Sequence, residues 1–457
     1  MTDISPVTAS KLSSPFFLYL KAPQEKQRPS PRADGVVHLG DRSGAGLCLH
    51  NNFRHLWALP DGRKEPVQAF FLLALGVWAA DKLAIRSRQP DGWTRELVLE
   101  IPTIPGWARF APGLAQLLNF LTGDLWTIRP RETQVDVALA AIWPHSWQPT
   151  AVTLFSGGLD SLTGAIDLLE TGHRLVLVSH YDYGQLAATQ QSLAAALREH
   201  YGPDRLHHLA VRVQFEGPEL SLRSRSLLYL ALGLAAASAF PGPLPLFIPE
   251  NGWISLNPPL TLNRLGAYST RTTHPHFLGG LVDFWKEAGI TQDLKNPYQA
   301  LTKGEMVARC RNLGLLEKLA PLSISCARPV MGRWQKEPGG ACGYCYPCLV
   351  RRAALNRLGW DRGRDYRVDV LAGEEILRHR VKGGHLRSLC LALKTWEEHP
   401  REILARLFWN GEPGVLSPHL TAARRLLGAG FGEIAQWLYD RGSTDIKKFL
   451  GNRDQTN

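Results

Sequence analysis

The sequence predicts an α/β protein in which a parallel sheet carries helices on both faces. From Thr150 onward, short apolar strands alternate with helical stretches, a pattern typical of strand–helix–strand units. A glycine-rich turn, at residues 154–161, links the first of these strands to the next helix. Because ligands of such sheets bind beyond the carboxyl ends of the strands, we expect the functional site at this turn.

Residues 1–148 precede this sheet and are predicted to form an accessory α+β domain. Strands are expected at residues 16–20 and 35–39, and a helix at residues 66–83 with proline near its start. A proline-flanked linker at residues 144–149 marks the end of the domain. The region carries no catalytic constellation, so we expect it to bind a partner, present a substrate or buttress the core.

The central domain is predicted to span residues 149–362, followed by an all-helical region at residues 363–457. Apolar runs in the central domain predict strands at residues 151–155, 174–179, 208–213 and 246–248, and helices at residues 162–170, 186–200, 224–240, 277–288 and 303–313. Beyond residue 362, helical stretches are separated by Gly, Pro or Asn, for example at residues 410–414. This last region has no catalytic motif and is expected to dock on the core or on a partner.

The glycine-rich turn reads Leu-Phe-Ser-Gly-Gly-Leu-Asp-Ser. A strand, a glycine turn and a helix N-terminus in this order point several backbone N–H groups at one spot, which suits a phosphate or pyrophosphate. Gly157 and Gly158 permit positive φ and close approach of the backbone. Asp160 is placed to cap the helix or to hold a Mg²⁺ ion that neutralises the anion. No Gly-Lys-Ser/Thr follows the glycines, which excludes a Walker-type phosphate loop.

A cysteine cluster follows later in the chain. Cys342, Cys345 and Cys348 are separated by two residues each, so three thiols can converge on one ion. Cys326 is the nearest candidate for the fourth ligand, and Cys310, on a predicted helix, is its competitor. We predict a structural zinc held by Cys326 and the other three cysteines, with an iron–sulfur cluster as the alternative. Four sulfur ligands leave no position for water, so we assign the metal no catalytic step.

The composition bounds the class of protein. Among 457 residues, 44% are hydrophobic and 20% are charged, as in ordinary globular proteins. The net charge of +11 permits an anionic partner such as ATP or nucleic acid, but no element combines aromatic residues and arginines in one stripe. No apolar stretch reaches the roughly 18 residues of a membrane span, and the N-terminus lacks a secretory signal. We therefore expect a cytoplasmic protein that requires neither a membrane nor nucleic acid.

The string Ser-Gly-Gly-x-Asp-Ser resembles the pyrophosphate loop (PP-loop) of the N-type ATP pyrophosphatases. Together with the later cysteine cluster, it resembles the 7-cyano-7-deazaguanine synthase (QueC) family over residues 150–360. Further similar segments are Tyr183-Gly184-Gln185, Arg225-Ser226, Leu301-Thr302-Lys303-Gly304-Glu305-Met306, Ser325-Cys326 and the Arg351 that follows the cysteines. The resemblance implies a PP-loop, HUP-like sheet for the central domain.

The resemblance also implies a reaction. ATP adenylates the carboxylate of 7-carboxy-7-deazaguanine, pyrophosphate leaves, and a nitrogen nucleophile attacks the acyl adenylate; the implied cofactors are ATP, Mg²⁺ and Zn²⁺. Lys303 is the candidate cation for the α-phosphate, and Asp160 and Arg271 are the other catalytic candidates. The residues that would bind ATP are Leu154, Phe155, Ser156, Gly157, Gly158, Leu159, Asp160, Ser161 and Arg225.

The candidate substrate-binding residues are Gln185, Glu250, Asn251, Arg271 and Thr272. Glu250 follows a predicted strand, where a carboxylate can accept hydrogen bonds from a guanine-like base. Arg271 can pair with the substrate carboxylate in a fork. Gln185 can hydrogen-bond the nucleobase or a phosphate, and His274 is either a general base or a turn residue.

Three features depart from the family pattern: the long spacing from Cys326 to Cys342, the segment at residues 249–275, and the two flanking regions. These features resemble the QueC-like proteins of the Qat anti-phage defence systems, and they favour a partner protein of a defence operon as the nitrogen acceptor. One alternative is a housekeeping synthase that uses ammonia and forms a nitrile. A second is an ATP-binding nucleic-acid or regulatory module without turnover.

Overall fold

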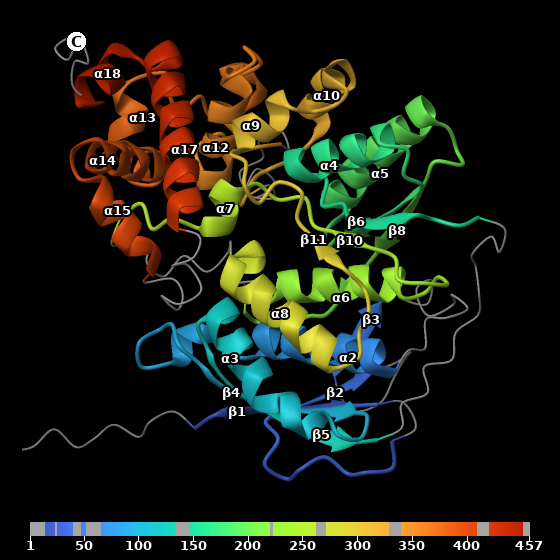
Figure 1. The fold of residues 1–457 in the computed structure, drawn as a ribbon. Coiled ribbons are helices and arrows are strands. Elements are labelled where there is room, and N and C mark those ends of the chain that lie inside the picture. The colour runs from blue at the N-terminus through green and yellow to red at the C-terminus, as the bar shows by residue number, and fades with distance from the viewer. Residues whose placement is uncertain are drawn as a thin grey trace, which may run out of the picture. The chain divides into compact units, whose positions relative to one another are not determined.

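The computed structural model describes residues 14–22, 25–39, 47–51, 65–133, 147–219, 223–261, 271–328, 340–408 and 420–450 (Figure 1). The chain divides into two compact units. Unit 1 consists of Met1–Asn51, Glu65–Ala138 and Gln214–Ala231. Unit 2 consists of Asn52–Lys64, Leu139–Val213 and Leu232–Asn457. Residues 144–146 of the predicted linker and the Gly/Pro segment at residues 410–414 lie outside the described residues.

Unit 1 is built on a six-stranded sheet with the strand order β5-β4-β1-β2-β3-β9. The strands are β1 (Phe16–Lys21), β2 (Gly35–Leu39), β3 (Leu47–Asn51), β4 (Glu96–Thr103), β5 (Leu125–Glu132) and β9 (Val213–Gln214). The predicted mixture of strands and helices is present, and the pairs β1–β2, β1–β4, β2–β3 and β4–β5 are all parallel. Parallel pairing requires crossover connections, which here include α2 (Glu65–Leu83) and α3 (Ala111–Thr122).

Helix α2 forms the core of unit 1. It is apolar almost all round and packs on β1, β2 and β4. A Cβ at Gly76 would lie 3.1 Å from the Leu99 side chain, so the glycine allows the helix to approach the sheet closely. Contrary to the expectation from the sequence, this helix is long and apolar enough to cross a membrane, but 78% of its most apolar window is buried in the protein, as expected of a core helix.

Unit 1 contains a buried cluster of charged side chains. Arg95 contacts both Asp81, at 2.5 Å, and Asp124, at 2.7 Å, and Arg86 contacts Asp124 at 2.7 Å. Burial by itself would raise the pKa of Asp124, but Arg95 and Arg86 lower it. Asp81 also accepts hydrogen bonds from the N–H and hydroxyl of Ser224, at 2.9 and 2.8 Å. The cluster therefore fixes the residues that lead into α6 (Arg225–Ala237).

We expect Asp124→Ala to destabilise unit 1 by about 3–5 kcal/mol, because two buried arginine cations, Arg86 and Arg95, lose one of the two carboxylates that they share and keep Asp81 alone. Urea unfolding monitored by tryptophan fluorescence would measure the change. Glu96→Ala, at an exposed position of β4, serves as the control and should change stability by less than about 0.5 kcal/mol. Equal stabilities of the two variants would contradict the prediction.

Unit 2 contains the predicted parallel sheet, with the strand order β11-β10-β6-β7-β8. The strands are β6 (Ala151–Leu154), β7 (Leu175–His180), β8 (Leu206–Val211), β10 (Leu246–Phe247) and β11 (Leu294–Lys295). Helices α4 (Leu159–Glu170) and α5 (Gly184–Tyr201) share a buried cluster with one face of the sheet (Figure 1). On the other face, Gly233 of α6 packs directly on Leu154 and Leu246. The predicted fold class is confirmed.

Among the predicted helices whose bounds differ in the structure, two differ for a clear local reason. Helix α4 begins at Leu159, three residues before the predicted start, because Gly158 already serves as its N-cap. The helix predicted at residues 303–313 is interrupted and forms α9 (Lys303–Ala308) and α10 (Leu313–Leu319). The Asn312 side chain accepts a hydrogen bond from Leu315 N at 3.0 Å and starts the second helix.

The C-terminal region is helical, as predicted. Its helices are α13 (Glu374–Arg378), α14 (Gly384–Glu398), α15 (Pro400–Leu407), α17 (Leu420–Arg441) and α18 (Thr444–Leu450), and they follow α12 (Tyr346–Asn356) of the predicted central domain. They share one hydrophobic cluster with the cysteine segment and with the short helix α7 (Gly252–Leu256). The helical region is therefore packed as a continuation of the core of unit 2.

Candidate functional site

The glycine-rich turn has the predicted strand–turn–helix geometry. It leaves β6 after Leu154 and enters α4 at Leu159. Gly157 has a φ of 81°, a conformation that strains other residues, and a Cβ there would lie 3.2 Å from the Gln190 side chain. Asp160 and Ser161 occupy the first turn of α4, at the positive end of its dipole. This arrangement can bind a phosphate group.

Side-chain hydrogen bonds stabilise the conformation of the turn. The Ser161 hydroxyl donates to Gly158 O at 3.1 Å and lies 3.2 Å from the Ser156 hydroxyl. Gln190 Nε2 donates to Ser156 O and to His180 O, both at 3.2 Å. Sequence reasoning missed Gln190; the available signal was a polar residue on the buried side of a helix.

A distant segment also contacts the turn. Ile324 N donates to Gly157 O at 2.9 Å, and Leu159 N donates to the Ser325 hydroxyl at 3.1 Å. Behind this segment, Arg351 donates to Ser323 Oγ at 2.8 Å and to the carbonyl of Ala320. The residues just before Cys326 are therefore part of the wall of the turn.

Four residues of unit 2 form a buried polar group that we call the Asp160 cluster: Asp160, Glu250, Asn251 and Lys303. The ammonium of Lys303 pairs with Asp160, and the two side chains are 6% and 8% exposed. Asn251 donates to the same carboxylate through Nδ2 at 2.6 Å and through its N–H at 3.2 Å. The amide of Asn251 also donates to Glu250 Oε1 at 3.2 Å. The structure thus brings together four residues that the sequence singled out separately.

The pKa values of the two carboxyl groups in the Asp160 cluster are shifted in opposite directions. Burial would raise the pKa of Asp160, but Lys303 and hydrogen bonds from Glu250 and Asn251 lower it to about 2. Burial and the neighbouring Asp160 raise the pKa of Glu250 well above its usual range. Asp160 is therefore the ionised partner of Lys303, whereas the pKa of Glu250 is shifted toward the protonated form.

The other substrate candidates have identifiable structural surroundings. Asn251 caps α7 by accepting a hydrogen bond from Ile254 N at 3.0 Å. Arg271 and Thr272 form the short turn η4 (Arg271–Thr273), and the Arg271 residue is 6% exposed. The Ser255 hydroxyl of α7 donates to Thr273 at 2.9 Å and joins this turn to α7. Residues 262–270 of the atypical segment lie outside the described residues.

His274 has the surroundings of a turn residue. Its Nδ1 accepts a hydrogen bond from His276 N at 3.2 Å and caps α8 (Pro275–Glu287). Burial and the Arg271 cation lower its pKa to about 3, so the ring is neutral at neutral pH. Gln185 lies in the first turn of α5, and Arg225 begins α6 within unit 1. Their proposed ligand contacts stay predictions.

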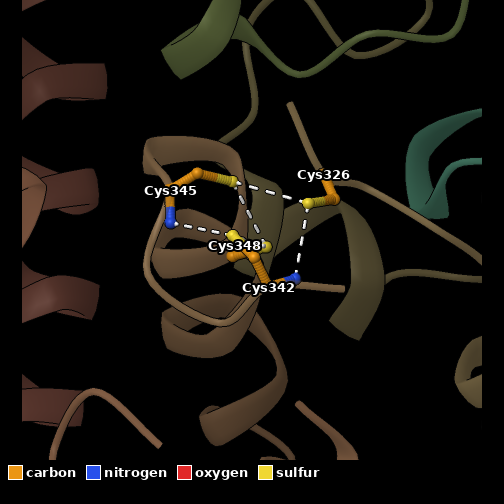
Figure 2. Close-up of side chains that lie close together, drawn as sticks. All are labelled: Cys326, Cys342, Cys345 and Cys348. Atoms are coloured by element: carbon orange, nitrogen blue, oxygen red, sulfur yellow. Dashed lines mark hydrogen bonds between the residues drawn. The ribbon is translucent and has the colours of Figure 1, made fainter. Parts of the chain in front are cut away.

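The cysteine site contains the four predicted residues (Figure 2). Cys342, Cys345 and Cys348 surround the start of α12, and Cys326 approaches from a separate segment. All four Sγ atoms lie within 4.8 Å of one another, with separations of 3.9 Å for Cys342–Cys348 and 3.8 Å for Cys326–Cys345. Bonds of about 2.3 Å from a tetrahedral zinc would place the sulfurs about 3.8 Å apart. The donor set fits zinc.

Backbone N–H groups support negative charge on these sulfurs. Cys326 Sγ accepts from Arg328 N at 3.3 Å and from Cys342 N at 3.4 Å, and Cys342 Sγ accepts from Cys345 N at 3.3 Å. Hydrogen bonds from the other three thiols lower the pKa of Cys326. Cys310 lies in the other hydrophobic cluster, and burial raises its pKa to about 12. It is a core thiol.

Comparisons with known proteins identify several relatives. No protein-family model matches the chain, and no solved structure matches it. The 7-cyano-7-deazaguanine synthase of Novosphingobium aromaticivorans is 31% identical over 243 residues, which covers 94% of that protein and 48% of this chain. The synthases of Parasynechococcus marenigrum and Gluconacetobacter diazotrophicus are 29% and 27% identical, and the matches cover 95% and 92% of those proteins. The similarity thus spans nearly the full length of these relatives and about half of this chain.

Proposed function

Because the chain belongs to the 7-cyano-7-deazaguanine synthase family, we propose that it catalyses ATP-dependent C–N bond formation on a deazaguanine-type carboxylate. The observation that carries the proposal is the glycine turn with the Asp160–Lys303 pair at its end. The turn offers backbone donors for phosphates, and the pair offers a buried cation beside them. The substrate class comes from the name that the relatives share.

In the first step, a substrate carboxylate oxygen attacks the α-phosphorus of ATP and the bond to pyrophosphate breaks. The turn at Ser156–Ser161 would bind the departing pyrophosphate, and Lys303 would stabilise the charge that develops on the α-phosphate. Mg²⁺ bound to the nucleotide would supply further charge neutralisation. Since Lys303 and Asn251 already engage Asp160, we assign its carboxylate to holding Lys303.

In the second step, a nitrogen nucleophile attacks the acyl carbon and expels AMP, which leaves an amide. We propose an amine of a partner protein as the acceptor, within a bacterial anti-phage defence system. The support is that about half of this chain lies beyond the match to the synthases. Arg271, which is buried near α7, would pair with the substrate carboxylate, with Thr272, Gln185 and Glu250 as further contacts. The alternative is the housekeeping reaction, in which ammonia is the acceptor and the amide is dehydrated to a nitrile.

A turnover assay tests the proposal. The protein is mixed with ATP, Mg²⁺ and 7-carboxy-7-deazaguanine, with and without ammonium, and the nucleotide and base products are identified by mass spectrometry. Pyrophosphate release is measured alongside. Pyrophosphate with an acyl adenylate or an amide that stops before the nitrile supports a partner amine. AMP with the nitrile in ammonium supports the housekeeping alternative. Absence of pyrophosphate release under both conditions would refute the adenylation chemistry.

We expect Ser325→Ala to weaken ATP binding by about 3- to 10-fold, because the turn loses one hydrogen-bond partner worth roughly 1 kcal/mol at Leu159 N. Isothermal titration calorimetry with ATP would measure the change. Bound metal should be retained, since the four cysteines are intact. The control is Ser388→Ala. The Ser388 hydroxyl donates to Gly384 O of its own helix α14, so this variant should bind ATP like the wild type. A Ser325→Ala variant with unchanged affinity would show that this contact does not shape the turn.

A further inference from the structure

Helix α17 of the C-terminal region packs against the two short helices that position Asn251 and Lys303 of the Asp160 cluster. It contacts α7, which Asn251 caps, and α9, which begins at Lys303. A Cβ at Gly430 of α17 would lie 2.2 Å from the Trp253 ring, and a Cβ at Gly252 would lie 2.6 Å from Leu426 of α17. Because a side chain at either glycine would clash, the two helices pack closely, and α17 constrains where α7 lies.

Glu433 of α17 places its carboxylate at the start of α9. One oxygen accepts a hydrogen bond from the Thr302 hydroxyl, and the other accepts from Gly304 N at 3.1 Å. The carboxylate therefore holds the residues on both sides of Lys303. A Cβ at Gly304 would lie 2.6 Å from this carboxylate, so a larger residue would displace it. Arg357, the residue that follows α12, contacts Glu433 at 3.3 Å and balances its charge.

A second residue of α17 holds the same segment. Arg425 contacts Glu305 at 2.5 Å and donates to the carbonyl of Ala300. Backbone and side-chain groups around Lys303 are thus hydrogen-bonded to α17, whereas the Lys303 ammonium is bonded to Asp160 at the glycine turn. The position of the ammonium depends on both attachments.

We propose that Glu433 is a positioning residue for Lys303, through which the C-terminal helical region sets the geometry of the Asp160 cluster. The catalytic consequence rests on the proposed function of Lys303. The geometric part does not, because it concerns only how firmly α9 holds the ammonium against Asp160. Loss of the Glu433 carboxylate should free the start of α9 and expose the amine.

The test compares Glu433→Ala and Glu433→Gln with Arg424→Ala, a change at an exposed residue of the same helix. The first readout is acetylation of Lys303 by an amine-reactive reagent in the resting protein, measured by peptide mass spectrometry. We expect Glu433→Ala to accelerate it about tenfold over the wild type, because local opening exposes a buried group. Acetylation of Lys295, which is already half exposed, should not change. Glu433→Gln keeps one acceptor oxygen and loses the other, so its acetylation rate should lie between those of the wild type and of Glu433→Ala.

The second readout is AMP formation. Glu433→Ala should lower kcat about 10- to 100-fold with a smaller change in the KM for ATP, since misplacement of a catalytic cation affects the reacting state most. In a Lys303→Ala background, the Glu433 change should cause no further loss, because both act through one group. If wild type releases neither pyrophosphate nor AMP while acetylation still rises in Glu433→Ala, the proposed function fails and the positioning role stands. Unchanged acetylation and kcat in both Glu433 variants would overturn the inference; if Glu433→Ala does not fold, Glu433→Gln decides.

Discussion

Lys303→Ala is expected to lower the rate of AMP formation by about 100- to 1,000-fold, the usual cost of removing one preorganised group that stabilises transition-state charge. The lysine side chain is 6% exposed and its ammonium pairs with Asp160, so it is held in place before the substrate arrives. Quenched-flow or steady-state measurement of AMP in the presence of 7-carboxy-7-deazaguanine would give the rate. Lys295→Ala, at a lysine that is 51% exposed on β11, is the matched control and should retain full activity.

Asp160→Asn separates the role of the pair from the role of the cation. This variant removes the ionised partner of the buried Lys303 ammonium. We therefore expect its free energy of unfolding to fall by about 3–5 kcal/mol, in addition to a loss of activity. Lys303→Ala leaves the hydrogen bonds from Asn251 to Asp160 in place and should be destabilised less. Full AMP formation by Lys303→Ala, with melting unchanged in both variants, would mean that the pair serves neither chemistry nor stability.

Removal of the metal is expected to unfold the cysteine segment and to abolish ATP binding. The free energy of a structural zinc site, about 10–16 kcal/mol, is largely folding free energy. Cys326 directly follows Ser325, whose hydroxyl accepts from Leu159 N, so disorder at the metal site would reach the glycine turn. Thermal unfolding with and without a strong chelator, and ATP titration of the chelated protein, would measure both effects.

Cys345→Ser tests the same site by mutation. We expect loss of one bound zinc per chain and a much lower melting temperature, whereas Cys310→Ser, at a cysteine outside the cluster, should retain the metal. Elemental analysis of the wild type distinguishes zinc from the iron–sulfur alternative. A Cys345→Ser protein with full zinc content and unchanged melting would refute the four-cysteine site.

Features that depend on neighbours in the chain were predictable from the sequence alone. The glycine turn was recognised because a strand, two glycines and a helix start occur within a few residues, and the positive φ of Gly157 agrees with that interpretation. The parallel sheet followed from alternating strands and helices, and three of the metal-site cysteines followed from their spacing. In each case the physical cause, a backbone conformation or a local periodicity, acts over a short stretch of chain.

Only the tertiary structure decided which distant groups meet and in which direction the pKa of each one shifts. Asp160 and Lys303 are separated by 143 residues, and the contact of Glu433 with Thr302 spans 131 residues, so no local pattern could reveal either pair. Asp160 and Glu250 are both carboxylic acids in the sequence, yet Lys303 and hydrogen bonds lower the pKa of Asp160, whereas burial and the neighbouring Asp160 raise the pKa of Glu250. The pKa of a side chain is set by desolvation and by the charges around it, and both arise only when the chain folds.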